Sequence, residues 1–231
     1  MKKYDVSNNG LKLNDYDFEK IIPHGFFNAV FSRAGVGKTS FIVQVALNAM
    51  LKQKNVLHIA IGDPVNKISL WYKEIFYLLA ERNKIKEKGF LFESLLKKRF
   101  IMTFNVDAFS VPRLTERLSD LSEQDIFTPE MIIIDGLDFN GSVRESIEEI
   151  KKFAEKIPLE TWFTVRTHRH EDPGPGLLPI QLSNIENFFD VLIQLSPEGK
   201  KIHVFTLKGK KTDANYEIVV DPSTMLIKID E

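Results

Sequence analysis

Short apolar runs alternate with amphipathic stretches along most of the chain. Residues 26–31 and 56–61 are apolar runs of strand length, and each is followed by a stretch with helical spacing of its apolar positions, at 39–51 and 67–79. This alternation is typical of an α/β protein with a mainly parallel, twisted sheet that helices cover on both faces. The same spacing predicts further strands at 100–104, 131–134 and 161–165 and further helices at 112–121 and 143–157, the last with a capping-box pair, Ser142 and Glu145, at its start.

The pattern changes after residue 165, where apolar runs follow one another with little helix between them. These runs, at 191–195, 202–207, 216–220 and 225–229, predict antiparallel strands at the C-terminal edge of the sheet. A chain of 231 residues can bury one sizeable core, and its Pro/Gly-rich stretch at 172–179 is interpreted as a loop rather than a linker. We expect one domain over residues 1–231, with a lead-in segment at 1–25, a core at 26–195 and C-terminal β-hairpins at 196–231.

Composition excludes several functional classes. The 31 Lys and Arg residues balance 32 Asp and Glu residues, which argues against a globally basic nucleic-acid binder. The absence of cysteine excludes disulfides, thiolate zinc sites and Cys-based catalysis. No apolar run approaches the roughly 18 to 20 residues of a membrane span, and no apolar segment follows Lys2 and Lys3. We expect a cytoplasmic protein without a membrane partner.

The strongest chemical signal is a glycine-rich segment between the first predicted strand and the first predicted helix. Residues 32–40 match the phosphate-binding P-loop except that Ser32 stands at the first position, where glycine is usual. Gly35 and Gly37 allow the turn that points backbone N–H groups at one anion. Lys38 is expected to reach the β- and γ-phosphates, and the Thr39 hydroxyl to ligate Mg²⁺. The nucleotide-binding residues predicted in this segment are Ser32, Arg33, Ala34, Gly35, Val36, Gly37, Lys38, Thr39 and Ser40.

A second signal is the apolar run 131–134, which ends in Asp135. A buried strand that presents a carboxylate beside the P-loop would orient Mg²⁺ directly or through water. Hydrophobic strands that end in Asp at a turn are also common without any such role. The 97 residues between Lys38 and Asp135 leave room for two further strand–helix units, and two are predicted there, so we include Asp135 in the nucleotide and metal site.

On these residues the chain resembles the RecA-like P-loop ATPases, most closely their KaiC-like and DnaB-like branches. The resemblance covers nearly all of the chain, including the turn at 22–25 that leads into the first core strand. It implies ATP and Mg²⁺ as ligands, and it aligns Asp63 with the catalytic glutamate that polarises the attacking water. Aspartate is one methylene shorter than glutamate, and a carboxylate set back by about 1 Å can cost about a hundredfold in rate.

The resemblance also implies roles for three cations. Arg166 falls at the position of a sensor that contacts the γ-phosphate, where glutamine is more usual. Lys208 and Lys210 fall at the two cations that reach the γ-phosphate held by a neighbouring subunit, with Lys in place of the usual Arg. Lysine cannot make the bidentate contact of arginine. This assignment implies a homo-oligomeric ring or filament, for example a hexamer, while the alternative is a solvated basic hairpin end.

Nucleic-acid binding is less well supported. In DNA-working relatives two loops grip the backbone, and here they correspond to 136–142 and 167–176. The first contains Asp138 and no basic residue, and in the second Glu171 and Asp172 offset the basic Arg169. The two imidazoles at positions 168 and 170 lack a third spaced ligand, so we interpret that loop as a polar lip rather than a metal site.

The sequence therefore predicts an ATP-binding protein that hydrolyses ATP slowly with Mg²⁺ at a subunit interface, as a KaiC-like regulatory or assembly ATPase. Two alternatives stay open. One is a DNA- or RNA-dependent motor of the recombination or helicase type. The other is a nucleotide-gated binding module with little or no hydrolysis. No group in the sequence separates ATP from GTP, and the protein partner is not identified.

Overall fold

One mixed sheet forms the centre of the protein. The structure, a computed structural model, describes residues 12–13, 16–140, 143–157, 159–167, 174–210 and 217–230. Six parallel strands come first along the chain: β3 (Phe27–Arg33), β4 (Val56–Ile61), β5 (Arg99–Phe104), β6 (Met131–Asp135), β7 (Glu160–Thr167) and β8 (Val191–Glu198). Three antiparallel strands complete the sheet: β9 (Lys201–Lys208), β10 (Glu217–Val220) and β11 (Ile227–Asp230).

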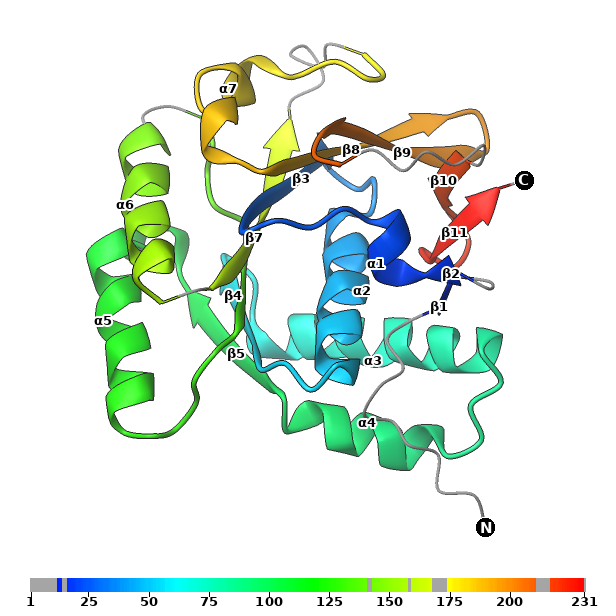
Figure 1. The fold of residues 1–231 in the computed structure, drawn as a ribbon, viewed down its shortest axis with the longest axis horizontal. Helices are drawn as coiled ribbons and strands as arrows, with labels where there is room; N and C mark the ends of the chain where they lie inside the picture. Colours follow the sequence, from blue (N-terminus) through cyan, green and yellow to red (C-terminus); the bar gives the residue numbers. More distant parts are fainter. Residues whose placement is uncertain are drawn as a thin grey trace.

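The order of the strands across the sheet is β11-β10-β9-β8-β3-β7-β6-β4-β5 (Figure 1). All pairings from β8 to β5 are parallel, and those from β8 to β11 are antiparallel. In parallel strands the carboxyl ends meet at one edge of the sheet. The ends of β3, β7, β6 and β4 therefore lie along a common edge, and this edge carries the P-loop and Asp135.

Helices cover both faces of the sheet (Figure 1). One face packs against α2 (Lys38–Leu51), α3 (Val65–Arg82) and α4 (Lys88–Leu96), and the other against α5 (Val111–Glu123) and α6 (Val143–Lys156). Alternate residues of β3 enter the two apolar clusters: Val30 joins the first, and Ala29 and Phe31 join the second. A strand that is buried on both faces must be apolar throughout, which explains the continuous runs in the sequence.

Several short elements complete the described chain. The lead-in segment contains the two-stranded pair β1 (Lys12–Leu13) and β2 (Tyr16–Asp17) and the helix α1 (Phe18–Ile21), whose Phe18 and Ile21 are buried. The others are α7 (Ile180–Ser183) and the 3₁₀ turns η2 (Val106–Ala108) and η4 (Glu186–Phe188). No helix in the described ranges is long and apolar enough to cross a membrane.

The predicted α/β class is confirmed, with a mainly parallel sheet covered on both faces and antiparallel strands at its C-terminal edge. Each strand and helix predicted from residue 26 onward is present, with shifted ends. The sequence analysis did not predict α4 or the elements of the lead-in segment. The strand predicted at 225–229 was wrong at its start, because Met225 adopts φ 58° in a turn and β11 begins at Ile227.

Candidate nucleotide-binding site

The P-loop connects the end of β3 to the start of α2. Gly35 and Gly37 have φ of 77° and 107°, in the left-handed region that favours glycine. Gly37 is the N-cap of α2, and no side-chain hydrogen bond caps this helix. The first turn of α2 therefore keeps backbone N–H groups for an outside acceptor, and the helix dipole favours an anion there.

Lys38 folds back onto the loop from the first position of α2. Its Nζ donates to the carbonyl oxygens of Ser32 and Arg33, both at 2.9 Å, and lies 3.3 Å from the Ser32 hydroxyl. Burial lowers the pKa of Lys38 to about 8; Asp135 opposes this shift and the neighbouring cation of Arg166 adds to it. Ser32 thus contributes two contacts where the usual motif has glycine. The ammonium is poorly solvated, which makes a triphosphate tail a favourable partner for it.

Thr39 and Asp135 are in direct contact. The Thr39 hydroxyl donates to Oδ2 of Asp135 at 3.2 Å, and the Thr164 hydroxyl on β7 donates to Oδ1 at 2.5 Å. Thr164 in turn accepts from the backbone N–H of Gly136 at 3.3 Å. Burial alone would raise the pKa of Asp135, but the imidazole of His58 and the hydroxyls of Thr164 and Thr39 hold that pKa below its ordinary value. The result is an ionised carboxylate beside a hydroxyl, a donor set of the type that Mg²⁺ prefers.

Two members of this cluster were missed by the sequence analysis. His58 lies in the middle of β4, fully buried, and Thr164 is buried on β7. The available signal was a polar residue inside an otherwise apolar strand, because such a residue needs a polar partner across the sheet. The strand order that brings both residues to Asp135 is not visible in the sequence.

Asp63 lies just beyond the carboxyl end of β4, at the same edge of the sheet. Its Oδ1 accepts from Nζ of Lys67, one helical turn later in α3, at 2.8 Å. Arg166 is exposed near the end of β7 and is level with Ser32 on β3. The structure therefore brings Arg166 beside the P-loop and leaves Asp63 engaged with a neighbouring lysine.

Lys208 and Lys210 do not lie at the P-loop of their own chain. Lys208 ends the antiparallel strand β9 and pairs with Leu192 near the amino end of β8. Its Nζ donates to the carbonyl oxygen of Glu186 at 2.9 Å, and Lys210 is exposed. Both residues are thus at the edge of the sheet opposite the P-loop. The basic residue after Lys210, the loop around Arg169, and Ser142 lie outside the described residues.

The C-terminal turn borders the P-loop on the side of α2. Gln44 of α2 donates to the carbonyl oxygen of Met225 at 3.0 Å and accepts from the N–H of Ile227 at 2.8 Å. The Sδ of Met225 would lie 3.4 Å from a Cβ on Gly37. The turn between β10 and β11 therefore forms a wall at the start of α2.

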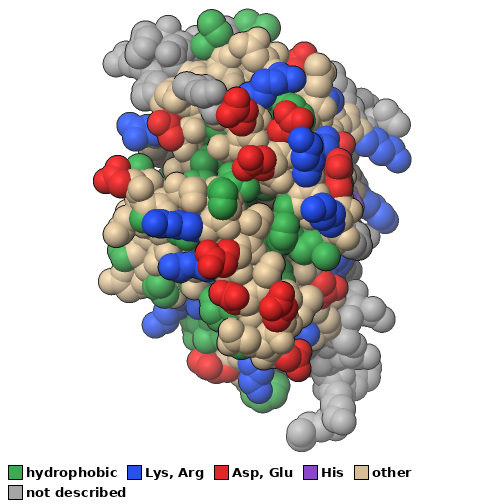
Figure 2. All heavy atoms as spheres, turned by 90° about the vertical axis from the view of Figure 1, so that its left-hand side faces the viewer, with side chains coloured by type: hydrophobic (Ala, Val, Ile, Leu, Met, Phe, Trp, Pro, Cys, Tyr) green, Lys and Arg blue, Asp and Glu red, His purple; other side chains and the backbone are tan. Residues whose placement is uncertain are grey.

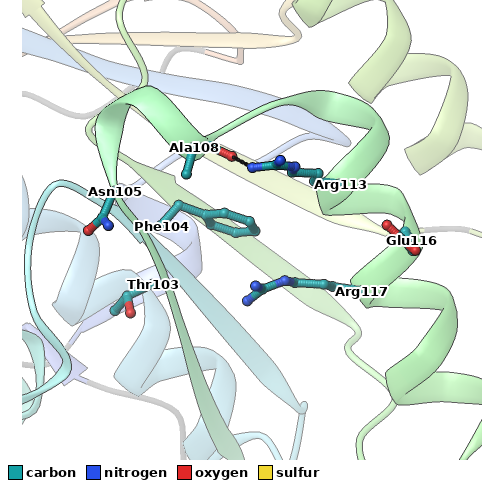
Figure 3. Close-up of a pocket in the computed structure, with 7 residues that line it drawn as sticks. All are labelled: Thr103, Phe104, Asn105, Ala108, Arg113, Glu116 and Arg117. Carbon is teal, nitrogen blue, oxygen red and sulfur yellow. Dashed lines mark hydrogen bonds between the residues drawn. The ribbon is translucent and has the colours of Figure 1, made fainter.

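The largest cavity found among the described residues is elsewhere. It has a volume of about 440 Å³ and lies between the end of β5 and α5, where the Phe104 ring points toward α5 and the Arg117 guanidinium lies 4.9 Å from the ring centroid (Figure 3). Arg113 donates to the carbonyl oxygen of Ala108 at 3.1 Å in the same wall. No P-loop residue lines this cavity, so a concave pocket does not mark the candidate site.

The face covered by α5 and α6 carries charges of both signs. Figure 2 shows acidic and basic side chains interspersed over this face, with apolar side chains between them. A phosphate backbone would require a contiguous basic surface. Among the described residues no cluster of three His, Asp or Glu side chains is suited to hold a metal ion.

Comparison with known proteins gives a fold-level result. No protein-family model matches the chain, and no curated protein matches it. Among solved structures, the ATPase domain of a DnaB-family helicase is similar, with a TM-score of 0.63 and 14% identity over 99% of this chain and 94% of that one. A KaiC-like protein from the archaeon Pyrococcus horikoshii has a TM-score of 0.62 and 14% identity over 96% of this chain and 99% of that one. The chain therefore has the fold of RecA-like P-loop ATPase domains, with the KaiC-like and DnaB-like affinities that the sequence resemblance implied.

Proposed function

We propose that the protein binds ATP with Mg²⁺ and hydrolyses it slowly at a subunit interface, as a KaiC-like regulatory or assembly ATPase. The observation that supports this most directly is the contact between Thr39 and Asp135, 3.2 Å apart, beside the buried ammonium of Lys38. These three groups supply a metal-binding pair and a phosphate-binding cation at one edge of the sheet. The two fold neighbours, an ATPase domain and a KaiC-like protein, agree with this function.

The residues present fit the magnesium nucleotide. Thr39 and Asp135 would hold the metal shell, and the P-loop N–H groups with Lys38 would hold the phosphates. When bound, Mg²⁺ would neutralise charge on the β- and γ-phosphate oxygens. Arg166, exposed beside Ser32, is within the same electrostatic environment as Lys38 and would add positive charge near the γ-phosphate.

The chemical step would be attack of water on the γ-phosphorus. The water oxygen bonds to phosphorus as the bond to the β–γ bridging oxygen breaks, and a water proton passes to Asp63, which leaves ADP and inorganic phosphate. Asp63 must first leave Lys67, its partner at 2.8 Å. Both this ion pair and the short aspartate side chain predict slow turnover.

The test of nucleotide binding is calorimetry with a nonhydrolysable ATP analogue and Mg²⁺. Lys38→Ala should weaken binding by at least about a hundredfold, since a buried charge-assisted contact is lost. Lys54→Ala is the matched control, because Lys54 pairs with Glu160 at the far end of the sheet and should bind normally. Equal affinity of wild type and Lys38→Ala would contradict the proposed site.

The second candidate function is a nucleotide-gated binding module with little hydrolysis. The ion pair between Asp63 and Lys67 favours it, because the candidate base is not directed at a water. Measuring phosphate release from Asp63→Glu separates the two functions. A gain of about tenfold or more is expected for a slow ATPase, and no gain favours the module.

A DNA- or RNA-dependent motor has weaker support. The described part of the loop after β6, residues 136–140, carries Asp138 and no basic side chain. The motor predicts that single-stranded nucleic acid accelerates phosphate release. Unchanged release in the presence of single strands is the result that we expect.

A further inference from the structure

A buried histidine lies behind the metal-binding carboxylate. His58 on β4 has no solvent exposure, and its Nε2 is buried with no hydrogen-bond partner among the described residues. This nitrogen lies 3.8 Å from Oδ2 of Asp135, the same oxygen that accepts from Thr39. The separation is too long for an ordinary hydrogen bond and too short to hold a bridging water. The imidazole therefore faces the carboxylate directly.

The other ring nitrogen has a defined partner. Nδ1 of His58 lies 3.1 Å from the hydroxyl of Tyr72 on α3. A carboxylate can only accept, so the tautomer that suits Asp135 carries its proton on Nε2. Nδ1 is then an acceptor, and the Tyr72 O–H donates to it. This arrangement satisfies Nδ1 and directs Nε2–H at Oδ2.

Tyr72 is itself held in place. Its side chain is fully buried, and the guanidinium of Arg99 lies 4.7 Å from the centroid of its ring. The rings of His58 and Tyr72 meet edge to face, with centroids 5.7 Å apart. Tyr72 therefore fixes the orientation of the imidazole from the side opposite Asp135.

We propose that His58 is a positioning residue for Asp135, which it holds in the orientation that receives the metal shell of the bound nucleotide. The proposal rests on the proposed nucleotide site. Thr164 fixes Oδ1 from β7, and His58 faces Oδ2 from β4, so the carboxylate is oriented from both neighbouring strands. Outer partners of this kind typically change metal affinity by about 10- to 100-fold when they are removed.

The test measures how much Mg²⁺ is needed for half-maximal binding of a nonhydrolysable ATP analogue. His58→Leu should raise that concentration by about tenfold or more and leave binding of the analogue in EDTA unchanged. His58→Gln keeps an N–H donor and should recover part of the loss. Asn28→Leu is the control for lost core polarity, because Asn28 is fully buried but bonds Gly25 and Thr161 at the other end of the sheet. Its magnesium dependence should be that of wild type.

A second measurement does not require a folded His58 variant. In wild type, ¹⁵N NMR of the imidazole should show the proton on Nε2, and the Nε2 resonance should move when Mg²⁺ is added to the nucleotide complex. Tyr72→Phe, which removes the donor to Nδ1, should shift the magnesium dependence in the same direction as His58→Leu. A proton on Nδ1, or wild-type magnesium dependence in a folded His58→Leu, would overturn the positioning role.

The two proposals fail in different ways. If wild type binds no nucleotide, the proposed function is wrong and the magnesium titration has no signal. If wild type and Asn28→Leu bind and respond to Mg²⁺ while folded His58→Leu responds equally, only the role of His58 is wrong.

Discussion

The ammonium of Lys38 is a charge that the fold holds at a cost. Two carbonyl oxygens receive it in the nucleotide-free protein, but burial still lowers its pKa to about 8. A lysine in the unfolded chain keeps its ordinary pKa of about 10.4. Between these values the unfolded chain binds more protons, so the free energy of unfolding rises with pH across this window, and the penalty is complete below it.

Replacing this lysine should therefore stabilise the protein while removing its function. We expect Lys38→Met to raise the free energy of unfolding at pH 7 by about 1–3 kcal/mol, with an advantage that shrinks as the pH approaches 10.5. Urea unfolding of both proteins without nucleotide, at several pH values, measures it. A variant less stable than wild type at pH 7 would show that the carbonyl contacts outweigh the burial of the charge.

Gly136 illustrates a backbone requirement beside the metal-binding carboxylate. Its φ is 93°, and an added Cβ would lie 2.4 Å from the carbonyl oxygen of Ile61. Gly136→Ala should lower the free energy of unfolding by about 3 kcal/mol or more, since it combines strain with a clash against backbone. Gly89→Ala, in α4 with open space around the added carbon, should gain about 0.5–1 kcal/mol in the same denaturation experiment.

At the residue scale, sequence predicts a site when its residues are close along the chain. The P-loop could be identified because its glycines, Lys38 and Thr39 are consecutive and their context is a strand and a helix. Asp135 could be proposed from the end of an apolar run. His58 and Thr164 could not, because they reach Asp135 only after β4, β6 and β7 are placed side by side. The partner of Asp63 was also missed, although Lys67 follows it at helical spacing.

At the element scale, α2 is joined to both ends of the domain's chemistry. Its first turn forms the P-loop, and one turn later Gln44 bonds Ser40, Met225 and Ile227. Gln44 is fully buried, so these bonds replace the missing sheet partners of the turn that ends at β11. The C-terminal hairpin and the phosphate loop are thereby fixed relative to each other.

Removing this junction should destabilise the protein more than an ordinary polar substitution. Gln44→Met keeps the volume of the side chain but leaves the N–H of Ile227 and the carbonyl of Met225 buried without partners. We expect a loss of about 2–4 kcal/mol in the free energy of unfolding. Gln124→Met, an exposed glutamine at the end of α5, should change it by less than about 0.5 kcal/mol. Equal effects of the two substitutions would contradict a role for the Gln44 contacts.

Elements were predicted well where burial dictates the pattern. The six parallel strands are apolar along their length because helices cover both faces, and the amphipathic α5 and α6 show one apolar side. The helix α4 was missed because its apolar residues are few and the basic stretch before it was interpreted as the end of a helix. In the structure Lys84 turns at φ 54° between α3 and α4. Turns of this kind depend on packing that local spacing does not report.

At the scale of the whole molecule, the predicted cations and the P-loop lie on opposite edges of the sheet. Lys208 is level with Leu192, near the amino end of β8, while the P-loop follows the carboxyl end of β3. These cations can therefore reach a γ-phosphate only if it is bound by another copy of the chain. A head-to-tail contact of this kind is heterologous and repeats around a ring or along a filament. Catalysis at the interface thus becomes a question about assembly.

Mixing two inactive variants tests this arrangement. Lys38→Ala lacks the phosphate-binding lysine, and the double variant Lys208→Ala, Lys210→Ala lacks the cations. Each should assemble but release little phosphate by itself. In a mixture of equal amounts, about a quarter of the interfaces join an intact P-loop to intact cations, so phosphate release should recover to about a quarter of the wild-type rate. Lys200→Ala, at the exposed β8–β9 turn, is the control and should be fully active alone. If the double variant is fully active alone, Lys208 and Lys210 belong to a solvated hairpin end. If mixing restores nothing while each variant assembles with nucleotide, the neighbouring subunit does not complete the site.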